Sequence, residues 1–341
     1  MHISWMVAFF VCFAAVLVLK PAAVNWGLVD TPDKRKRHIG SIPLVGGLAI
    51  YLSTLTSVSL FVENSHQINL ILVSISLIVF IGALDDRYDL SAKLRLIAQI
   101  LTASVLTFGT DIHIYSLGNL LGAGEVVTGS FSGVVTVLAI VAGINAFNMV
   151  DGIDGLAGTL ALLSLLAIGY LVAGADLQLL IGVFSASLIV FLLFNLGLFS
   201  KKNKIFMGDA GSMMLGLVVS WLLIVSSQAE NARVAPVNVL WFIAVPLIDM
   251  VAVMYRRVRR GQSPLVADRE HLHHVFMDVG LSSRLALLFI TCISVFFSCI
   301  GLIFTIYNGS EFYSLLLFVF MFCIYNTLLD KRHKLKEWLN R

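Results

Sequence analysis

Eleven long apolar runs fill most of this 341-residue chain. They span roughly residues 3–19, 44–62, 68–84, 94–108, 131–147, 155–174, 178–199, 210–227, 235–255, 285–306 and 311–329. Most are long enough, as helices, to cross a hydrocarbon core of about 30 Å; the run at 94–108 is the shortest. Only 13% of the residues are charged, against about 25% in a usual soluble domain. The sequence therefore predicts an all-α polytopic membrane protein, a single integral-membrane domain over residues 1–341 with about eleven transmembrane helices.

Positive charges are distributed unevenly between the loops. If successive helices alternate in direction, 22 of the 23 Lys and Arg residues fall on one side of the membrane, and Arg233 is the exception. Lys and Arg close to helix ends stay in the cytoplasm. This rule predicts a periplasmic N-terminus, a cytoplasmic C-terminus with a basic tail over residues 330–341, and an odd number of spans.

The densest polar clusters all fall in the predicted cytoplasmic loops, beside helix ends. They are "GALDDRYDLSAKLR" at 82–95, "NAFNMVDGIDGLAG" at 145–158, "KKNKIFMGDAGS" at 201–212 and "YRRVRRGQSPLVADREHLHH" at 255–274. Each has an ordinary structural alternative: Asp85 and Asp86 could terminate a helix, and Asp209 could be a helix N-cap. Independent caps would be scattered over both faces of the membrane, and these clusters are not.

Taken together, the clusters indicate one kind of chemistry. Crowded carboxylates repel one another unless cations join them, and carboxylate, carboxamide and phosphate oxygens are hard ligands that suit Mg²⁺. Arginine and histidine at the same face would bind phosphate oxygens, and the glycines of "MGDAG" allow the backbone to approach a ligand closely. At a membrane boundary, this combination predicts metal-assisted phosphoryl transfer from a water-soluble donor to a lipid acceptor.

Four motifs resemble those of the polyprenyl-phosphate N-acetylhexosamine-1-phosphate transferases. They are "LDD" at 84–86, "NAFNMVDGIDG" at 145–155, "FMGDAGS" at 206–212 and "HLHH" at 271–274. Jointly they are specific, and the resemblance covers almost the whole chain. "GSIPLVGG" and "HLHH" depart from the branch that transfers phospho-MurNAc-pentapeptide. The chain is more similar to the bacterial branch that transfers GlcNAc-1-phosphate for enterobacterial common antigen and O-antigen (lipopolysaccharide) synthesis.

The resemblance implies a phosphotransferase of the bacterial inner membrane with its active site on the cytoplasmic face. The implied reaction converts UDP-GlcNAc and undecaprenyl phosphate into undecaprenyl-diphosphate-GlcNAc and UMP. Mg²⁺ is the implied cofactor, with Mn²⁺ as a substitute. The implied partners are the two substrates and the lipid bilayer. We expect no nucleic-acid partner, and a homodimer is compatible with the sequence, which does not fix the oligomeric state.

The resemblance also implies roles for individual residues. Asp85 and Asp86 resemble the catalytic pair that faces the lipid phosphate, and Asp209 and Asn148 resemble the metal ligands. The implied substrate-binding residues are Asp151, Asp154, Phe206, Arg257, His271, His273, His274 and Lys93. Among these, the two aspartates position the nucleotide, the phenylalanine stacks on uracil, the arginine and the first histidine contact the donor diphosphate and sugar, and the lysine lies near the lipid phosphate.

A general base contributes little to this reaction. A phosphomonoester has a second pKa of about 6, so the lipid acceptor is mostly a dianion at neutral pH. We therefore expect Asp85 and Asp86 to position groups and organise the metal. Covalent attack by one of them, in a double displacement, is the alternative.

Three other functions remain as alternatives. Another UDP-HexNAc donor would leave the reaction unchanged in type. A secondary transporter is suggested by Asp249, which lies within the apolar run 235–255, because intramembrane acids often mark ion paths. Transporter sites usually lie near the midplane, whereas here the acids crowd one interface, and Asp249 could instead hold a helix end through a hydrogen bond. An intramembrane aspartyl protease, suggested by "MGDAG", would not explain the histidines or the basic loop.

Overall fold

The structure is a computed structural model that describes residues 2–30, 40–63, 65–229, 232–263 and 270–330. Each of the eleven predicted apolar runs forms a helix. The helices are α1 His2–Trp26, α2 Gly46–Phe61, α3 His66–Tyr88, α4 Ala92–Thr110, α5 Ser132–Val150, α6 Leu156–Leu171, α7 Ala175–Asn195, α8 Gly208–Gln228, α9 Ala244–Arg259, α11 Ser283–Ile306 and α12 Glu311–Asp330. The predicted basic tail beyond residue 330 lies outside the described residues.

The helices confirm an all-α polytopic membrane protein. Within the described ranges, nine helices are long and apolar enough to cross a membrane, α4 among them. The other two, α2 and α6, are apolar but have only 16 residues each. Three short 3-10 segments, Gly129–Phe131, Lys201–Asn203 and Asn238–Ile243, precede or connect helices.

Two local elements go beyond the predicted helices. A short helix, α10 (Leu272–Asp278), follows the basic loop. Strand β1 (Val29–Asp30) pairs antiparallel with β2 (Ile42–Pro43), and the next residue, Leu44, forms a parallel bridge with Phe206. Hydrogen bonds from the amides of Gly46 and Gly47 to the carbonyls of Phe206 and Met207, both 2.9 Å long, continue this contact. The start of α2 therefore holds the turn that leads into α8.

Helix α8 is the central helix of the bundle. It packs against α2, α3, α5 and α6, and almost all of its residues are buried. Gly47 of α2 and Gly82 of α3 lie directly on the backbone of α8, at Gly211 and Ala210, where a Cβ atom on either glycine would overlap it. Small residues let membrane helices approach closely. This packing fixes the end of α3 against the beginning of α8.

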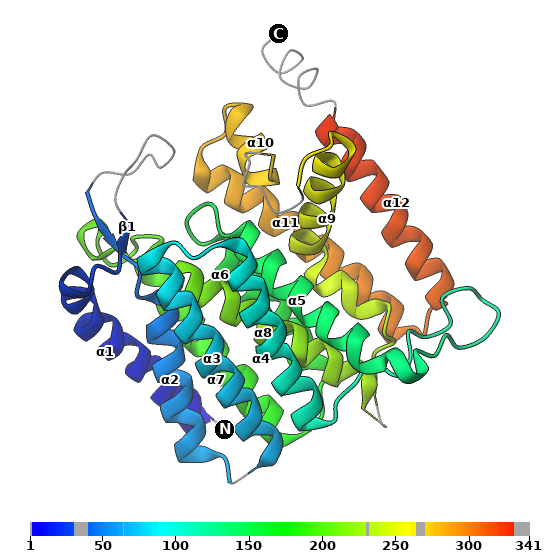
Figure 1. The fold of residues 1–341 in the computed structure, drawn as a ribbon, viewed down its shortest axis with the longest axis horizontal. Helices are drawn as coiled ribbons and strands as arrows, with labels where there is room; N and C mark the ends of the chain where they lie inside the picture. Colours follow the sequence, from blue (N-terminus) through cyan, green and yellow to red (C-terminus); the bar gives the residue numbers. More distant parts are fainter. Residues whose placement is uncertain (1, 31–39, 64, 230–231, 264–269, 331–341) are drawn as a thin grey trace.

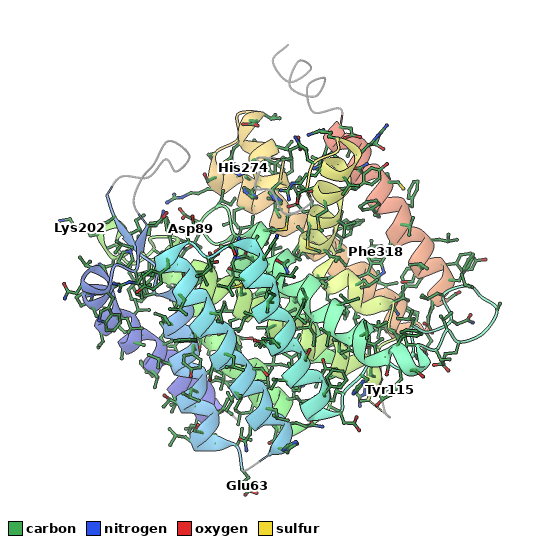
Figure 2. The ribbon with its side chains drawn as sticks, viewed as in Figure 1. Glu63, Asp89, Tyr115, Lys202, His274 and Phe318 are labelled. Atoms are coloured by element: carbon green, nitrogen blue, oxygen red, sulfur yellow. The ribbon has the colours of Figure 1, made fainter. Side chains whose placement is uncertain are left out.

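The first described helix starts and the last described helix finishes at opposite ends of the bundle (Figure 1). Figure 1 shows α1 starting at the lower end and α12 finishing at the upper end, with α10 at the top. In Figure 2, the labelled side chains of Asp89, Lys202 and His274 lie toward the upper end, while Glu63 and Tyr115 lie toward the lower end. Asp89, Lys202 and His274 belong to three of the four polar motifs, so these three motifs lie at the same, upper end of the molecule (Figure 2).

Candidate active site

Residues from three separate motifs meet where α3, α5 and α8 converge. Asp85 and Asp86 lie in the last turn of α3, Asn148 lies in the last turn of α5, and Asp209 lies in the first turn of α8. Since α8 packs along both α3 and α5, these ends are adjacent. The structure therefore brings together the predicted catalytic pair and the predicted metal ligands.

Asp86 caps α8. Its Oδ1 accepts a hydrogen bond from the backbone N–H of Asp209 at 2.7 Å, and its Oδ2 accepts one from the N–H of Ala210 at 3.2 Å. The first N–H groups of a helix lack partners within the helix and carry partial positive charge, which a carboxylate satisfies. Gly208 has φ +74° and lies against the Asp86 carboxylate, with no room for a side chain. Asp86 therefore caps α8 rather than the end of its own helix α3, and Asp209, the alternative N-cap, lies within the first turn of α8 instead.

Asp85 and Asp209 share one arginine. Asp85 is 4% exposed; its Oδ1 accepts the Leu90 N–H at 2.8 Å, and its Oδ2 accepts Arg95 Nη1 at 2.9 Å. The same Nη1 lies 3.8 Å from Asp209 Oδ2. Lys93, the cation singled out from the sequence, is exposed, whereas Arg95 reaches the acids. The arginine was missed, although it lies on the same face of α4 as the buried Gln99, four residues later.

Asn148 contacts the predicted metal ligand directly. Its Nδ2 donates to Asp209 Oδ1 at 2.7 Å and to Ser212 Oγ at 3.0 Å. One helical turn earlier, the Nδ2 of Asn145 donates to Gln99 Oε1 at 2.7 Å. The amide nitrogen of Asn148, rather than its oxygen, faces Asp209, so the side chain would turn its oxygen over to bind a metal. The paired carboxamides of the opening motif thus link α5 to α4 and α8.

The loop after α5 carries the predicted nucleotide-positioning aspartates. Burial first, and then the charges of Asp209 and Asp154, raise the pKa of Asp151 to about 7. Asp154 Oδ2 accepts Lys204 Nζ at 2.6 Å, and that ammonium lies 5.0 Å from the centroid of the Phe206 ring. The predicted aromatic ring therefore stands beside a cation and one of the predicted aspartates. Nothing in the sequence distinguishes Lys204 from the neighbouring lysines Lys201 and Lys202.

Asn195 ties this loop to the turn before α8. It is buried at the end of α7; its Oδ1 accepts the Gly155 N–H at 2.5 Å, and its Nδ2 donates to the Ile205 carbonyl at 2.8 Å. A carboxamide deep within the apolar run 178–199 was the available signal. Asn195 therefore positions the aspartate loop and the Phe206 segment relative to each other.

The basic loop is braced by an ion-pair network. Arg256 Nε donates to Glu270 Oε2 at 3.0 Å, and Arg260 Nη1 donates to Glu270 Oε1 at 2.5 Å. Arg256 Nη1 also donates to Asn326 Oδ1 of α12 at 3.2 Å. Arg257, the predicted diphosphate contact, is buried at the same end of α9. Glu270 thus holds the histidine motif next to the arginines.

The histidine motif lies at the start of α10, against the aspartate loop. His273 is 1% exposed, and its Nε2 lies against Gly152, where a Cβ atom would overlap it. Neither ring nitrogen has a hydrogen-bond partner among the described residues. Burial, reinforced by neighbouring His274, lowers the pKa of His273 to about 3, so the ring is neutral. His271 bonds to Asp249 through Nδ1 at 2.8 Å. The rings of His271 and His274 both lie next to that of His273, which is the histidine in contact with the nucleotide-positioning loop.

The donor atoms at the junction fit Mg²⁺. In the described part of the chain, no three His, Cys, Asp or Glu side chains gather as a ready-made metal site. Mg²⁺ is usually held by one or two carboxylates together with substrate phosphates and water. A carboxylate such as Asp209, with a side chain 35% exposed and a carboxamide beside it, supplies this kind of incomplete oxygen set. Burial is the main cause of the raised pKa of Asp151, and the negative charges of Asp209 and Asp154 add to it; a cation would offset only this second part.

Comparison with known proteins identifies the family of this chain. Residues 68–227 match the model of glycosyl transferase family 4. The chain is similar to proteins named undecaprenyl-phosphate alpha-N-acetylglucosaminyl 1-phosphate transferase. The Yersinia pestis protein is 39% identical, with 98% of this chain and 92% of the relative covered. The Haemophilus influenzae protein is 41% identical (99% and 97%), and the Escherichia coli K12 protein is 40% identical (94% and 89%). This chain therefore belongs to glycosyl transferase family 4.

Proposed function

We propose that this protein transfers GlcNAc-1-phosphate from UDP-GlcNAc to undecaprenyl phosphate and releases UMP. The observation that carries the proposal is the junction of α3, α5 and α8, where Asp209 meets Asn148 and is joined through Arg95 to Asp85. The names of the similar proteins support the same reaction. By this proposal, the protein performs the first membrane step in the synthesis of a polysaccharide of the O-antigen or enterobacterial common antigen type.

Asp209 and Asn148 would hold Mg²⁺, or Mn²⁺ in its place. When bound, the ion offsets the charge of the donor diphosphate. Arg95 is the only cation that the described contacts place between Asp85 and Asp209. Its guanidinium can turn from the carboxylates to a phosphate oxygen, since it binds both groups through the same donors. Arg95, rather than Lys93, is thus our candidate for contact with the lipid phosphate.

The donor would lie over the aspartate loop. Asp151 and Asp154 position the nucleotide, and Phe206 stacks on uracil with Lys204 at its face. Arg257, His271 and His274 contact the diphosphate and sugar. The neutral ring of His273, buried without a partner among the described residues, can donate one hydrogen bond and accept another at Gly152.

The reaction is a direct displacement. An oxygen of the ionised lipid phosphate attacks the β-phosphorus of UDP-GlcNAc, a new phosphoanhydride bond forms, and the old one breaks as UMP leaves with the bonding electron pair. Asp86 holds the first turn of α8, and with it Asp209, through the two cap hydrogen bonds. Asp85 orients Arg95. Neither acid needs to remove a proton or form a covalent bond.

The products of purified protein test this proposal. With UDP-GlcNAc, undecaprenyl phosphate and Mg²⁺, we expect UMP and lipid-linked GlcNAc in equal amounts, and two phosphates for each GlcNAc in the lipid product. Release of UDP instead of UMP would show transfer of the sugar without its phosphate and would contradict the proposal. UDP-GalNAc and the other UDP-HexNAc donors are assayed in parallel; a faster reaction with one of them would reassign the donor but not the reaction.

We also propose that the acidic junction faces the cytoplasm of a bacterial inner membrane. The end that carries Asp89, Lys202 and His274 is opposite the end that carries Glu63 and Tyr115 (Figure 2), and alternating helix directions predict 22 of the 23 Lys and Arg residues on the side of the first end. In a cysteine-free background, cysteines at Glu63 and Asn119 should react with an impermeant maleimide in cells whose outer membrane is permeabilised. Cysteines at Lys202 and Gln262 should react only after the inner membrane is opened. The reverse pattern would overturn the orientation.

A further inference from the structure

Asp249 lies in α9 and is 1% exposed, yet its carboxylate has three donors. Its Oδ2 accepts the Nδ1 of His271 at 2.8 Å. Its Oδ1 accepts the backbone N–H of Leu272 at 3.0 Å and the hydroxyl of Tyr325 at 2.5 Å. One buried acid therefore joins α9, the first turn of α10 and α12.

These contacts define the state of His271. A carboxylate only accepts hydrogen bonds, so the Nδ1 that faces it must carry a proton. Because the other ring nitrogen determines what a histidine offers to a ligand, the Asp249 contact fixes both the tautomer and the orientation of the ring. The His271 ring is also stacked parallel to that of His273, at 5.9 Å between centroids and 5° between planes. Because the two rings are stacked, the orientation of His271 also constrains the ring of His273, which lies against the aspartate loop.

The surrounding contacts hold Asp249 in place. Tyr325 and Asn326 are consecutive residues of α12; the first donates to Asp249, and the second accepts from Arg256, which binds Glu270 immediately before His271. Helix α12 has few other contacts with the bundle. Tyr325 and Asn326 of α12 therefore support the histidine motif from two sides, through Asp249 and through Arg256 with Glu270. A transporter-like ion path is not needed to explain Asp249, because its carboxylate accepts hydrogen bonds from His271, Leu272 and Tyr325.

We propose that Asp249, supported by Tyr325, is a positioning residue of the transferase: it holds His271 with Nδ1 protonated and Nε2 available to the donor diphosphate. The inference rests on the proposed function for its kinetic consequence but not for its structural one. Asp249→Asn is the informative variant, because asparagine keeps the shape and can still accept from Leu272. Its NH₂ group would then face His271 and force the opposite tautomer.

The first experiment is kinetic. Asp249→Asn should lower kcat/KM for UDP-GlcNAc by about 10- to 100-fold, by analogy with the loss of a carboxylate that orients a metal-ligating histidine. The split between KM and kcat should match that of His271→Gln, and KM for undecaprenyl phosphate should not change. In the His271→Gln background, Asp249→Asn should cause almost no further loss. Fully additive losses would show that Asp249 acts independently of His271 and would overturn the proposal.

The second experiment does not depend on activity. In protein labelled with ¹⁵N-histidine, the signals lost in His271→Gln identify that residue, and its Nδ1 should have the chemical shift of a protonated nitrogen. An unprotonated Nδ1 in the otherwise native protein would contradict the inference, even if no transfer were detected.

Asp176→Asn, a matched change at an exposed acid of α7, should leave kinetics and spectrum unchanged. Tyr325→Phe, which removes one donor and keeps the carboxylate, should cause a smaller loss than Asp249→Asn; an equal or larger loss would assign the effect to α12 packing.

Discussion

Replacement of Asp209 by asparagine is expected to lower kcat by more than about 10³-fold while the protein stays folded in the membrane. A metal that neutralises charge on transferring phosphate oxygens supplies several kcal/mol, and each 1.36 kcal/mol is about tenfold in rate. The structure separates this role from capping, because Asp86 and not Asp209 caps α8. Initial rates of UMP release, with Mg²⁺ varied over a wide range, measure the effect.

Asp89→Asn is the matched control. Asp89 lies at the same end of the molecule, is exposed, and has the left-handed conformation that asparagine also tolerates. The activity of the Asp89→Asn variant and its midpoint of thermal unfolding should equal those of the parent protein. The parent protein should stop turning over in excess EDTA and recover with Mg²⁺ or Mn²⁺. Full turnover in EDTA, or in folded Asp209→Asn, would contradict the assignment of the metal to this residue.

The helices were predictable from the sequence because a span is a local property. An apolar run within the bilayer must form a helix there, and all eleven runs do, although α2 and α6 have only 16 residues each. The grouping of motifs at one end was predictable from alternating helix direction and the unequal distribution of Lys and Arg. Both inferences need only the order of residues along the chain.

The contacts within the site were not predictable in the same way, because they join residues far apart in the sequence. The cap that Asp86 provides lies across the contact between α3 and α8, which depends on Gly82 and Ala210. The choice of Arg95 over Lys93 depends on which face of α4 turns toward Asp85. A single sequence shows which residues are polar but not which way each one faces.

The role of Asp249 shows the same limit. Its place in an apolar run suggested either an ion path or a hydrogen bond to a helix end, and the N–H of Leu272 confirms the second. Nothing in the local sequence of α9 indicates that Tyr325, 76 positions later, approaches the same carboxylate. That contact depends on how α12 packs beside α9.

In the proposed mechanism, the lipid phosphate attacks the donor directly, while the acids of α3 only position other groups. One phosphoanhydride breaks and another forms, so the equilibrium constant should lie within about tenfold of one, or about 1.4 kcal/mol. The reaction should therefore run backward when UMP is added. In a double displacement, an aspartate would take the phosphosugar first, and UMP would exchange into UDP-GlcNAc without lipid. In a direct displacement, exchange needs the lipid.

Exchange of radiolabelled UMP into UDP-GlcNAc is the measurement that distinguishes the two. We predict none in rigorously delipidated enzyme with Mg²⁺, and rapid exchange once undecaprenyl phosphate is added. Failure to exchange under both conditions would contradict the transfer reaction itself. Rapid exchange without lipid that disappears in Asp85→Asn or Asp86→Asn would show that one of these carboxylates is a covalent nucleophile.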